Sequence, residues 1–245
     1  MSEPVATPLR SRLSLSMILP LYNEIEILEQ NLGVIDSFLA RHFEDYEIVI
    51  VESGSTDGSG EKCDAVAARM PNVRVVHEGG RNGIGSATRI GIGLASKDLV
   101  WRNAIDLPSP LPAILEALPL FEKYDCVISY RSSDDRTAYR KLQSLVYNEV
   151  AKLLLGVKVR HVNAAFKVFR KRVIQQMPLS SNLSSIDAEM IYWIGKQGLS
   201  WVEIPVPITE RTGGQSTVPM SEPFRVLGDL VRLRLTGRIS GKRPS

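Results

Sequence analysis

Two polar segments separated by one helix-length stretch constrain this chain more than any other feature. An apolar run leads into Pro20-Leu21-Tyr22-Asn23-Glu24, and a second run over 47–51 leads into Glu52-Ser53-Gly54-Ser55-Thr56-Asp57-Gly58. Between them, apolar residues at helical spacing predict a helix of about sixteen residues, with Ile25, Leu28, Leu32, Ile35 and Leu39 on one face. In a parallel βαβ unit both strands end at the same edge, so the two loops should face each other across the crevice where open α/β sheets bind nucleotides.

The residues of these two loops have chemistry that suits a nucleotide. Pro20 lacks an N–H donor, so the segment after it, with Tyr22, can lie against a base without competing strand pairing. The carboxylates of Glu24 and Glu52 are suited to accept hydrogen bonds from ribose hydroxyls or a base N–H. The run over 54–59 supplies a tight turn and an N-cap for the next helix, and we expect Asp57 to serve only as a cap.

The rest of the chain continues as alternating strands and helices. Further strands are predicted over 73–77, 99–103, 126–130 and 201–206, and helices over 59–69, 84–95, 112–120, 136–155, 184–197 and 222–236. This alternation predicts an α/β fold, a mostly parallel central sheet flanked by helices. We expect a flexible arm over 1–12, one domain over 13–220, and a basic amphipathic helix and tail over 221–245.

The charge distribution and the two cysteines bear on where in the cell the protein works. From residue 221 onward six basic residues face two acidic ones, whereas the whole chain has a formal charge of only +3. The helix over 222–236 could therefore lie on an anionic membrane surface or pack on the domain with its arginines solvated. Cys63 and Cys126 lack metal-ligand spacing and suit a reducing compartment. We expect neither a signal peptide nor a transmembrane helix.

A glycine-rich segment, Gly79-Gly80-Arg81-Asn82-Gly83-Ile84-Gly85, matches the dinucleotide fingerprint of short-chain dehydrogenases, and Tyr192 and Lys196 mimic their catalytic pair. About two βα units precede this motif, whereas a dinucleotide motif should follow the first strand. Tyr192 also lies on a predicted amphipathic helix, where a core position is the simpler interpretation. We therefore do not assign dehydrogenase chemistry to this segment.

The two loop motifs together resemble the start of the family 2 inverting glycosyltransferases, nucleotide-sugar enzymes of the GT-A fold. The chain is most similar to their dolichyl-phosphate mannose synthase branch, which glycosylates a polyprenyl phosphate. The resemblance implies that Pro20, Tyr22, Glu24, Glu52 and Ser53 bind the nucleotide. The second motif of that family usually has two acidic residues before Gly-Ser, and here Glu52 keeps one carboxylate whereas Ser53 carries a hydroxyl. It also implies that Arg211 and Ser216, in a closing glycine-rich loop, contribute to the same site. The expected partners are a nucleotide-diphosphate sugar and a lipid phosphate, with no nucleic acid.

The metal motif of that family is changed here. The family carries Asp-x-Asp after the fourth strand to hold a divalent cation on the diphosphate, and this chain has Ala104 and Asp106 at those positions. Asp106 is thus the implied catalytic, nucleotide-binding and metal residue. Mg²⁺ or Mn²⁺ held largely by substrate phosphates and water needs only one or two carboxylates. His161 likewise stands where the family has an acidic residue.

Basic residues in the second half resemble the family's acceptor site. Arg131 ends a predicted strand, and Arg140 and Ser144 lie one turn apart on the helix that follows. The resemblance implies that these three hold the acceptor phosphate and that Arg131 is also catalytic. Arginine suits this role because its planar fork bonds phosphate oxygens bidentately.

The predicted function is therefore transfer of a hexose from a nucleotide sugar to a polyprenyl phosphate with inversion, in the cytoplasm or at the inner membrane face. Two alternatives stay open. The changes at Ala104 and His161 are compatible with a non-catalytic nucleotide-binding module. A glycosyltransferase with a hydroxyl acceptor would use Asp187 or Glu189 as its base.

Overall fold

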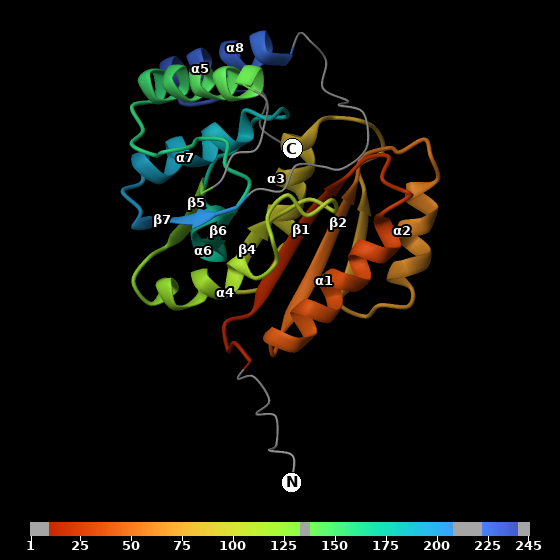
Figure 1. The fold of residues 1–245 in the computed structure, drawn as a ribbon. Helices are drawn as coiled ribbons and strands as arrows, with labels where there is room; N and C mark the ends of the chain where they lie inside the picture. Colours follow the sequence, from red (N-terminus) through yellow and green to blue (C-terminus); the bar gives the residue numbers. More distant parts are fainter. Residues whose placement is uncertain (1–9, 133–137, 208–221, 240–245) are drawn as a thin grey trace.

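A seven-stranded sheet forms the centre of the protein, with helices on both of its faces (Figure 1). The computed structural model describes residues 10–132, 138–207 and 222–239. The strands lie side by side in the order β3-β2-β1-β4-β6-β5-β7. In chain order they are β1 (Leu15–Leu21), β2 (Tyr46–Glu52), β3 (Val73–His77), β4 (Leu99–Arg102), β5 (Cys126–Arg131), β6 (Lys167–Arg170) and β7 (Trp201–Val206).

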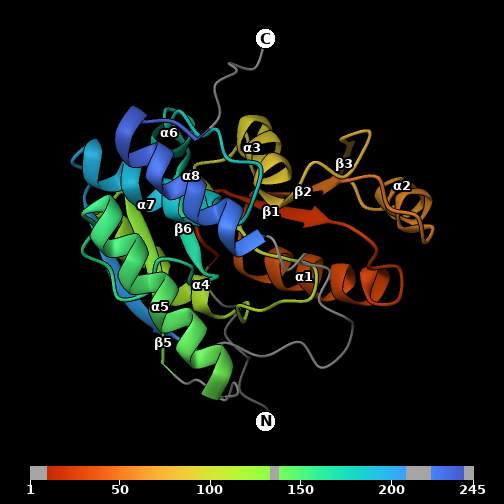
Figure 2. The same cartoon turned by 90° about the horizontal axis from the view of Figure 1, so that it is seen from above.

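A different set of helices covers each face of the sheet. One face packs against α1, α2, α4 and the short 3₁₀ helix η1, whereas α3, α5, α7 and α8 pack on the other (Figure 2). Their bounds are α1 (Leu28–His42), α2 (Ser59–Ala67), α3 (Ile84–Leu94), α4 (Ala113–Ala117), η1 (Leu118–Glu122), α5 (Ala138–Leu155), α6 (Lys171–Ile174), α7 (Ile186–Lys196) and α8 (Glu222–Thr236). None of the helices within the described ranges is long and apolar enough to cross a bilayer.

The predicted parallel sheet is confirmed, with one exception that the sequence did not indicate. Strand β6 runs antiparallel to both β4 and β5, while the pairs β1–β2, β1–β4, β2–β3 and β5–β7 are parallel. β6 has only four residues, too few for a clear alternation of apolar and polar side chains. Its position between β4 and β5 is decided by pairing with strands distant in the chain.

The start of α1 also differs from the prediction. The apolar spacing began at Ile25, but the helix begins at Leu28. The backbone N–H groups of Ile27 and Leu28 both donate to the carbonyl of Glu24, which closes a turn ahead of the helix. Residues 23–27 are therefore part of the loop at the sheet edge and not of the helix.

Close contact between α3 and the sheet depends on a glycine. A Cβ atom added to Gly91 would overlap Cγ2 of Ile18, which is fully buried in β1. Gly93, two residues further along the same helix, has no neighbouring atom within 4 Å of such a Cβ. The helix therefore approaches β1 through one glycine, while the other faces open space.

These two glycines give a matched test of the packing. Gly91→Ala should lower the free energy of unfolding by about 1–2 kcal/mol, because overpacking costs more than the gain in helix propensity. Gly93→Ala should raise it by about 0.5–1 kcal/mol through propensity alone. Urea unfolding of both variants measures this. Equal effects of the two substitutions would contradict the contact between α3 and β1.

Candidate functional site

The register of the sheet brings the ends of its parallel strands to one edge. Leu21 at the end of β1 lies opposite Glu52 at the end of β2, and Glu52 lies opposite His77 at the end of β3. On the other side of β1, Arg102 at the end of β4 pairs with Ile18. The loops after β1, β2, β3 and β4 therefore begin along a common edge, as predicted for the first two.

Hydrogen bonds join the loop after β1 to the loop after β2. The backbone N–H of Asn23 donates to Oγ of Ser55 at 3.0 Å, and that of Glu24 donates to Oγ of Ser59 at 2.9 Å. Asn23 has a φ of 54°, a left-handed conformation that few residues other than glycine adopt. The two loops thus form one connected surface, with Tyr22 and Glu24 on one side and Glu52 on the other.

Asp57 bonds to both sides of this junction. Its carboxylate accepts from its near neighbour Ser59 at 2.9 Å, as a cap does, and from the N–H of Ile25 at 3.2 Å. These hydrogen bonds outweigh its burial and lower the pKa of the Asp57 carboxyl. The N-cap of α2 is Gly58, which makes no side-chain cap bond, so Asp57 binds the first helical N–H from one residue before the cap. The expectation that Asp57 serves only as a cap is wrong, because the same carboxylate also fixes the first loop against the second.

Glu52 is the most enclosed acidic residue of this edge. The residue is only 4% exposed, and its Oε1 accepts from the backbone N–H of Ser55 while Oε2 lies 3.0 Å from Nδ1 of His77. Burial would raise the pKa of Glu52, but the hydrogen bonds from Ser55 and His77 outweigh it and lower that pKa. Glu52 is therefore held as a carboxylate with a fixed orientation.

His77 connects Glu52 to the surface. Its second ring nitrogen, Nε2, lies 3.0 Å from Oδ1 of Asp64 on α2. The two carboxylates, that of Asp64 foremost, raise the pKa of His77 by stabilising its charged form. Sequence reasoning did not single out His77, because nothing in its local pattern shows that it falls between two acidic side chains.

A second carboxylate, Glu78, bonds to the serine that stands in place of a family acidic residue. Oγ of Ser53 donates to Oε2 of Glu78 at 2.9 Å, and Oγ of Ser86 on α3 donates to Oε1 of the same residue. Ser53 is 5% exposed, so this bond is shielded from water. Glu78 was also not predicted as a site residue.

The glycine-rich segment lies directly against the predicted nucleotide loops. Gly54 has a φ of +70°, and a Cβ there would come within 2.8 Å of Cα of Gly80. The guanidinium of Arg81 lies over the ring of Tyr22, 4.4 Å from its centroid. Pro20 is half-buried in β1 beside Val51. The third strand thus adds a cationic side chain to the loop surface.

Asp106 lies in the loop that follows β4, next to β1 in the sheet. Nδ2 of Asn31 on α1 donates to the carbonyl of Ile105 at 2.8 Å, which fixes this loop to the helix after the first motif. Leu107, the residue directly after Asp106, has a φ of 51°, a strained value for a branched side chain. Asp106 is therefore held at the same edge as Glu24 and Glu52.

The described residues do not form a metal cage of their own. Within residues 10–132, 138–207 and 222–239, no group of three or more His, Cys, Asp or Glu side chains is placed to hold an ion. Ala104 contributes no oxygen ligand, so Asp106 is the one carboxylate of the loop over 103–110. This donor set fits a divalent cation only if phosphate oxygens and water supply most of its ligands.

Two of the three predicted acceptor residues, Arg131 and Ser144, meet on the other half of the edge. Nη1 of Arg131, the last residue of β5, donates to Oγ of Ser144 on α5 at 3.0 Å. Asn148, one turn further, donates to the carbonyl of Ser144 at 2.7 Å and accepts from the N–H of Val162. The backbone N–H of Arg131 donates to Nδ1 of His161 at 3.3 Å. The structure therefore brings Arg131 and Ser144 together, as predicted.

Three other predicted residues cannot be placed. Arg211 and Ser216 lie outside the described residues, and the side chain of Arg140 lies outside them although its backbone belongs to α5. Their assignment to the nucleotide and acceptor sites stays a prediction.

A buried ionic cluster lies between the strands of this second half. Oδ1 of Asp187 on α7 lies 2.7 Å from Nη2 of Arg102 and 2.8 Å from Nζ of Lys167, whose side chain is 1% exposed. Burial would raise the pKa of Asp187, but the two cations outweigh it and lower that pKa. Two basic side chains thus share the Asp187 carboxylate, and burial, the largest cause, lowers the pKa of Lys167.

Neither acidic residue of α7 is placed as an open base. Asp187 is neutralised by two cations, and Glu189 is fully buried, with its carboxylate accepting from the N–H groups of Ser180 and Ser181. Burial raises the pKa of Glu189 despite those hydrogen bonds. The ion-pair partners of Asp187 and the hydrogen-bond partners of Glu189 indicate that both residues have structural roles.

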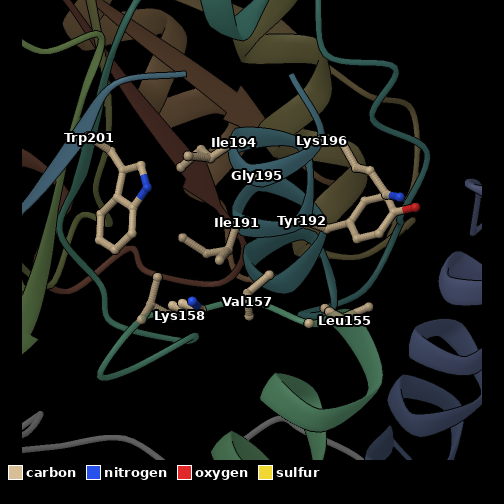
Figure 3. A pocket seen from close by; sticks show the side chains of 11 residues that line it. Leu155, Val157, Lys158, Ile191, Tyr192, Ile194, Gly195, Lys196 and Trp201 are labelled. Carbon is tan, nitrogen blue, oxygen red and sulfur yellow. The ribbon is translucent and has the colours of Figure 1, made fainter. Parts of the chain in front are cut away.

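A cleft of about 400 Å³ lies away from this edge, between the last turns of α5 and α7 and the start of β7 (Figure 3). Trp201 is the first residue of β7, which runs parallel to β5, so the cleft is at the opposite edge from Arg131. Tyr192 is 5% exposed, as expected for a core position, and Nζ of Lys196 lies 5.5 Å from its ring centroid. The predicted site and this cleft are separate features.

The fold defines the class of the protein. The architecture matches that of a Mycobacterium tuberculosis glucosyl-3-phosphoglycerate synthase solved with Mn²⁺, UDP and phosphoglyceric acid, with a TM-score of 0.68 at 20% identity over 95% of this chain and 80% of that one. The same enzyme with Mn²⁺ and UDP-glucose gives 0.67 at 17% identity, over 94% and 81%. The chain thus has the GT-A fold of nucleotide-sugar transferases, as predicted.

Sequence comparison then gives the family. The model of glycosyl transferase family 2 matches residues 16–177, and the chain belongs to that family. An undecaprenyl-phosphate mannosyltransferase of Micrococcus luteus is 26% identical over 92% of this chain and 96% of its own length. A polyprenol monophosphomannose synthase of Mycolicibacterium smegmatis is 26% identical over 93% and 89%. The predicted resemblance to the polyprenyl-phosphate branch is confirmed.

The pairing of Glu52, His77 and Asp64 makes stability depend on pH in a defined direction. Because the pKa of His77 is raised above its unfolded value of about 6.5, its contribution is complete below that pH and is lost as pH rises through the folded pKa. The contribution should be about 1 kcal/mol or less, since the side chain is 44% exposed. His77→Gln should remove this alkaline loss.

Melting temperatures of the wild type and His77→Gln, measured across about pH 5–9, test this effect. This range lies on both sides of the pKa of about 6.5 that histidine has in the unfolded chain. His42→Gln is the control, since that ring lies on α1 against Phe38. A difference between wild type and His77→Gln that is constant with pH would contradict the ion pairs at His77.

Proposed function

We propose that this protein transfers a hexose from a nucleotide-diphosphate sugar to a polyprenyl phosphate, with inversion at the anomeric carbon. The observation that carries the proposal is the pairing of Arg131 with Ser144 at the strand edge, across from the connected loops of Glu24 and Glu52. The relatives named for undecaprenyl phosphate and polyprenol support a lipid-phosphate acceptor.

The acceptor side requires positioning more than proton removal. A phosphate monoester has its second pKa near 6, so it is largely dianionic at neutral pH. Arg131 would hold two of its oxygens through its planar fork, with Ser144 and Arg140 completing the cradle. Arg102, one of the two basic side chains that pair with Asp187, would add to the attraction, since buried charges are weakly screened.

On the donor side, the proposed ligands are the loops after β1 and β2. Tyr22 and Pro20 would lie against the base, while Glu24, Glu52 and Ser53 would accept from or donate to the nucleoside. Asp106 would face the diphosphate, and Arg211 and Ser216 would close over it. A divalent cation, which the solved Mn²⁺ complexes of the structural relatives support, would neutralise the diphosphate when bound.

Transfer then follows from the placement of the two substrates. An oxygen of the acceptor phosphate forms a bond to the anomeric carbon, on the face opposite the donor diphosphate. The bond from that carbon to the diphosphate oxygen breaks, and its electron pair leaves with the nucleoside diphosphate. Arg131 would lower the barrier by holding the attacking oxygen in line. No proton transfer is required in this step.

We also propose a location at the cytoplasmic face of a membrane, with peripheral attachment. A polyprenyl phosphate is a membrane lipid, so transfer to it takes place at the bilayer surface. Cys63 and Cys126 are both free thiols buried in the fold, which fits a reducing compartment. We further propose that residues 13–220 form the catalytic domain.

The acceptor role of Arg131 can be measured directly. Arg131→Ala should lower transfer to a polyprenyl phosphate about a hundredfold, because a positioned charged donor to the reacting phosphate is lost. Arg172→Ala is the matched control and should change the rate little, since Arg172 is 73% exposed and pairs with Asp125 at the surface. Radiolabelled GDP- or UDP-hexose and a short polyprenyl phosphate serve as substrates. Equal rates for the two variants would exclude Arg131 from the acceptor site.

The change at Ala104 also favours a second candidate, a nucleotide-binding module without turnover. If the protein is an enzyme, Ala104→Asp adds a second oxygen ligand two residues before Asp106. We then expect this substitution to lower the Mn²⁺ concentration that gives half-maximal transfer by about tenfold. Ala104→Asn, of similar size but uncharged, is the control. Nucleotide binding by calorimetry, with no transfer by either the wild type or Ala104→Asp, would favour the module instead.

A further inference from the structure

The cleft between α5, α7 and β7 has the size of a small-molecule site. Its volume of about 400 Å³ falls within the range of about 300–1,000 Å³ that such sites have. Residues distant in the chain line it: 155–159 at and after the end of α5, five residues of α7 within 191–196, and Trp201 at the start of β7 (Figure 3). Because the packing of separate segments holds its walls, the cleft is a pre-formed feature of the fold.

The walls of the cleft favour a flat, apolar ligand. Leu155, Val159, Ile191 and Ile194 all line it and are all buried, so they present a close-packed aliphatic surface. The indole of Trp201 is only half-buried and lies at one end of the cleft (Figure 3). An aromatic ring that enters the cleft can stack on this indole and cover the aliphatic side chains at the same time.

Two lysines give the cleft a positive charge. Lys158 and Lys196 are exposed and line it, whereas its lining contains no acidic residue. Within the parts of the chain that the structure describes, neither ammonium group has a carboxylate partner. Glu203, the next residue on the same face of β7 as Trp201, accepts from the backbone N–H of Arg160 instead. An anionic group would therefore complement the lysines.

Gly195 contributes no side chain to the cleft that it lines. A Cβ atom added there would have no neighbouring atom within 4 Å, so the protein does not fill this space itself. A large side chain at this position would enter the cleft without overlapping the packed atoms around it. The cleft can therefore be blocked by one substitution.

We infer that this cleft binds a small aromatic anion, with its ring against Trp201 and the aliphatic walls and its carboxylate or phosphate paired with Lys158 and Lys196. A neutral ring would leave the ammonium groups without a partner, and an inorganic anion would leave the apolar walls uncovered. The cleft lies at the start of β7, whereas Arg131 ends the parallel strand β5 beside it. The inference is thus independent of the proposed function.

Titration calorimetry with three probes that share one ring system tests the inference. The anions are 2-naphthoate and 2-naphthyl phosphate, and the neutral probe is 2-naphthalenemethanol. The wild type should bind at least one anion with a Kd on the order of 0.1–1 mM, and the alcohol about tenfold more weakly. Binding of a single anion would identify its headgroup as the one that the site accepts. Equal binding of the alcohol, or no binding of either anion at millimolar concentration, would overturn the inference.

Substitution of the lysines separates charge from ring contacts. Lys158→Gln with Lys196→Gln should weaken binding of the anion about tenfold and leave that of the alcohol unchanged. Lys123→Gln is the matched control, because Nζ of Lys123 lies 5.5 Å from the ring centroid of Tyr124 outside the cleft, just as Nζ of Lys196 lies 5.5 Å from that of Tyr192. Wild-type affinity in the double variant would contradict the lysine contacts and overturn the inference.

Gly195→Phe tests the position of the ligand and should abolish binding of all three probes. Gly93→Phe on α3 is its control, since a Cβ there likewise has no neighbouring atom within 4 Å, and should leave binding unchanged. Anion binding that survives Gly195→Phe at wild-type affinity would place the ligand elsewhere on the protein and overturn the inference. Melting temperatures verify that each variant is folded, and the exposed lysines decide the question independently of Gly195→Phe.

Discussion

The buried carboxylate of Glu52 is the group on which the arrangement of the sheet edge depends. A charge that is 4% exposed is costly to bury unless hydrogen bonds replace its lost hydration. The N–H of Ser55 and the ring of His77 supply these bonds, so the turn after β2 and the end of β3 are fixed by the same anion. The loop after β1 is then held through Ser55, which accepts from the N–H of Asn23. The two loops that we propose bind the nucleotide are thus pre-arranged by one buried charge.

Charge is distributed unevenly along this edge. Carboxylates gather on the proposed donor half, at Glu24, Glu52 and Asp106, whereas the basic side chains of the buried cluster lie with Arg131 on the proposed acceptor half. An anionic acceptor phosphate would be attracted to the second half.

Much of this arrangement could be predicted from the sequence, because its determinants are local. The loops after β1 and β2 are marked by Pro20 and Gly54 next to apolar runs, and Ser144 lies at a fixed helical distance from Arg140. The antiparallel β6, the bonds of His77 to Glu52 and Asp64, and the two cations at Asp187 could not be predicted. Each depends on which distant segments pack together, and no local pattern of apolar or polar residues reports that.

Two positions that are usually acidic in the family carry Ser53 and Ala104 here, and the structure gives them different surroundings. Ser53 replaces an acidic residue, yet its hydroxyl is bonded to Glu78, so a carboxylate still reaches that place from the loop after β3. Ala104 supplies no oxygen ligand, and no group of three or more His, Cys, Asp or Glu side chains in the described part of the chain is placed to hold an ion. The anionic diphosphate of a donor would thus meet fewer protein ligands for a cation. Its neutralisation would then rest more on cationic side chains such as Arg81, which already lies over Tyr22 at the mouth of the two loops.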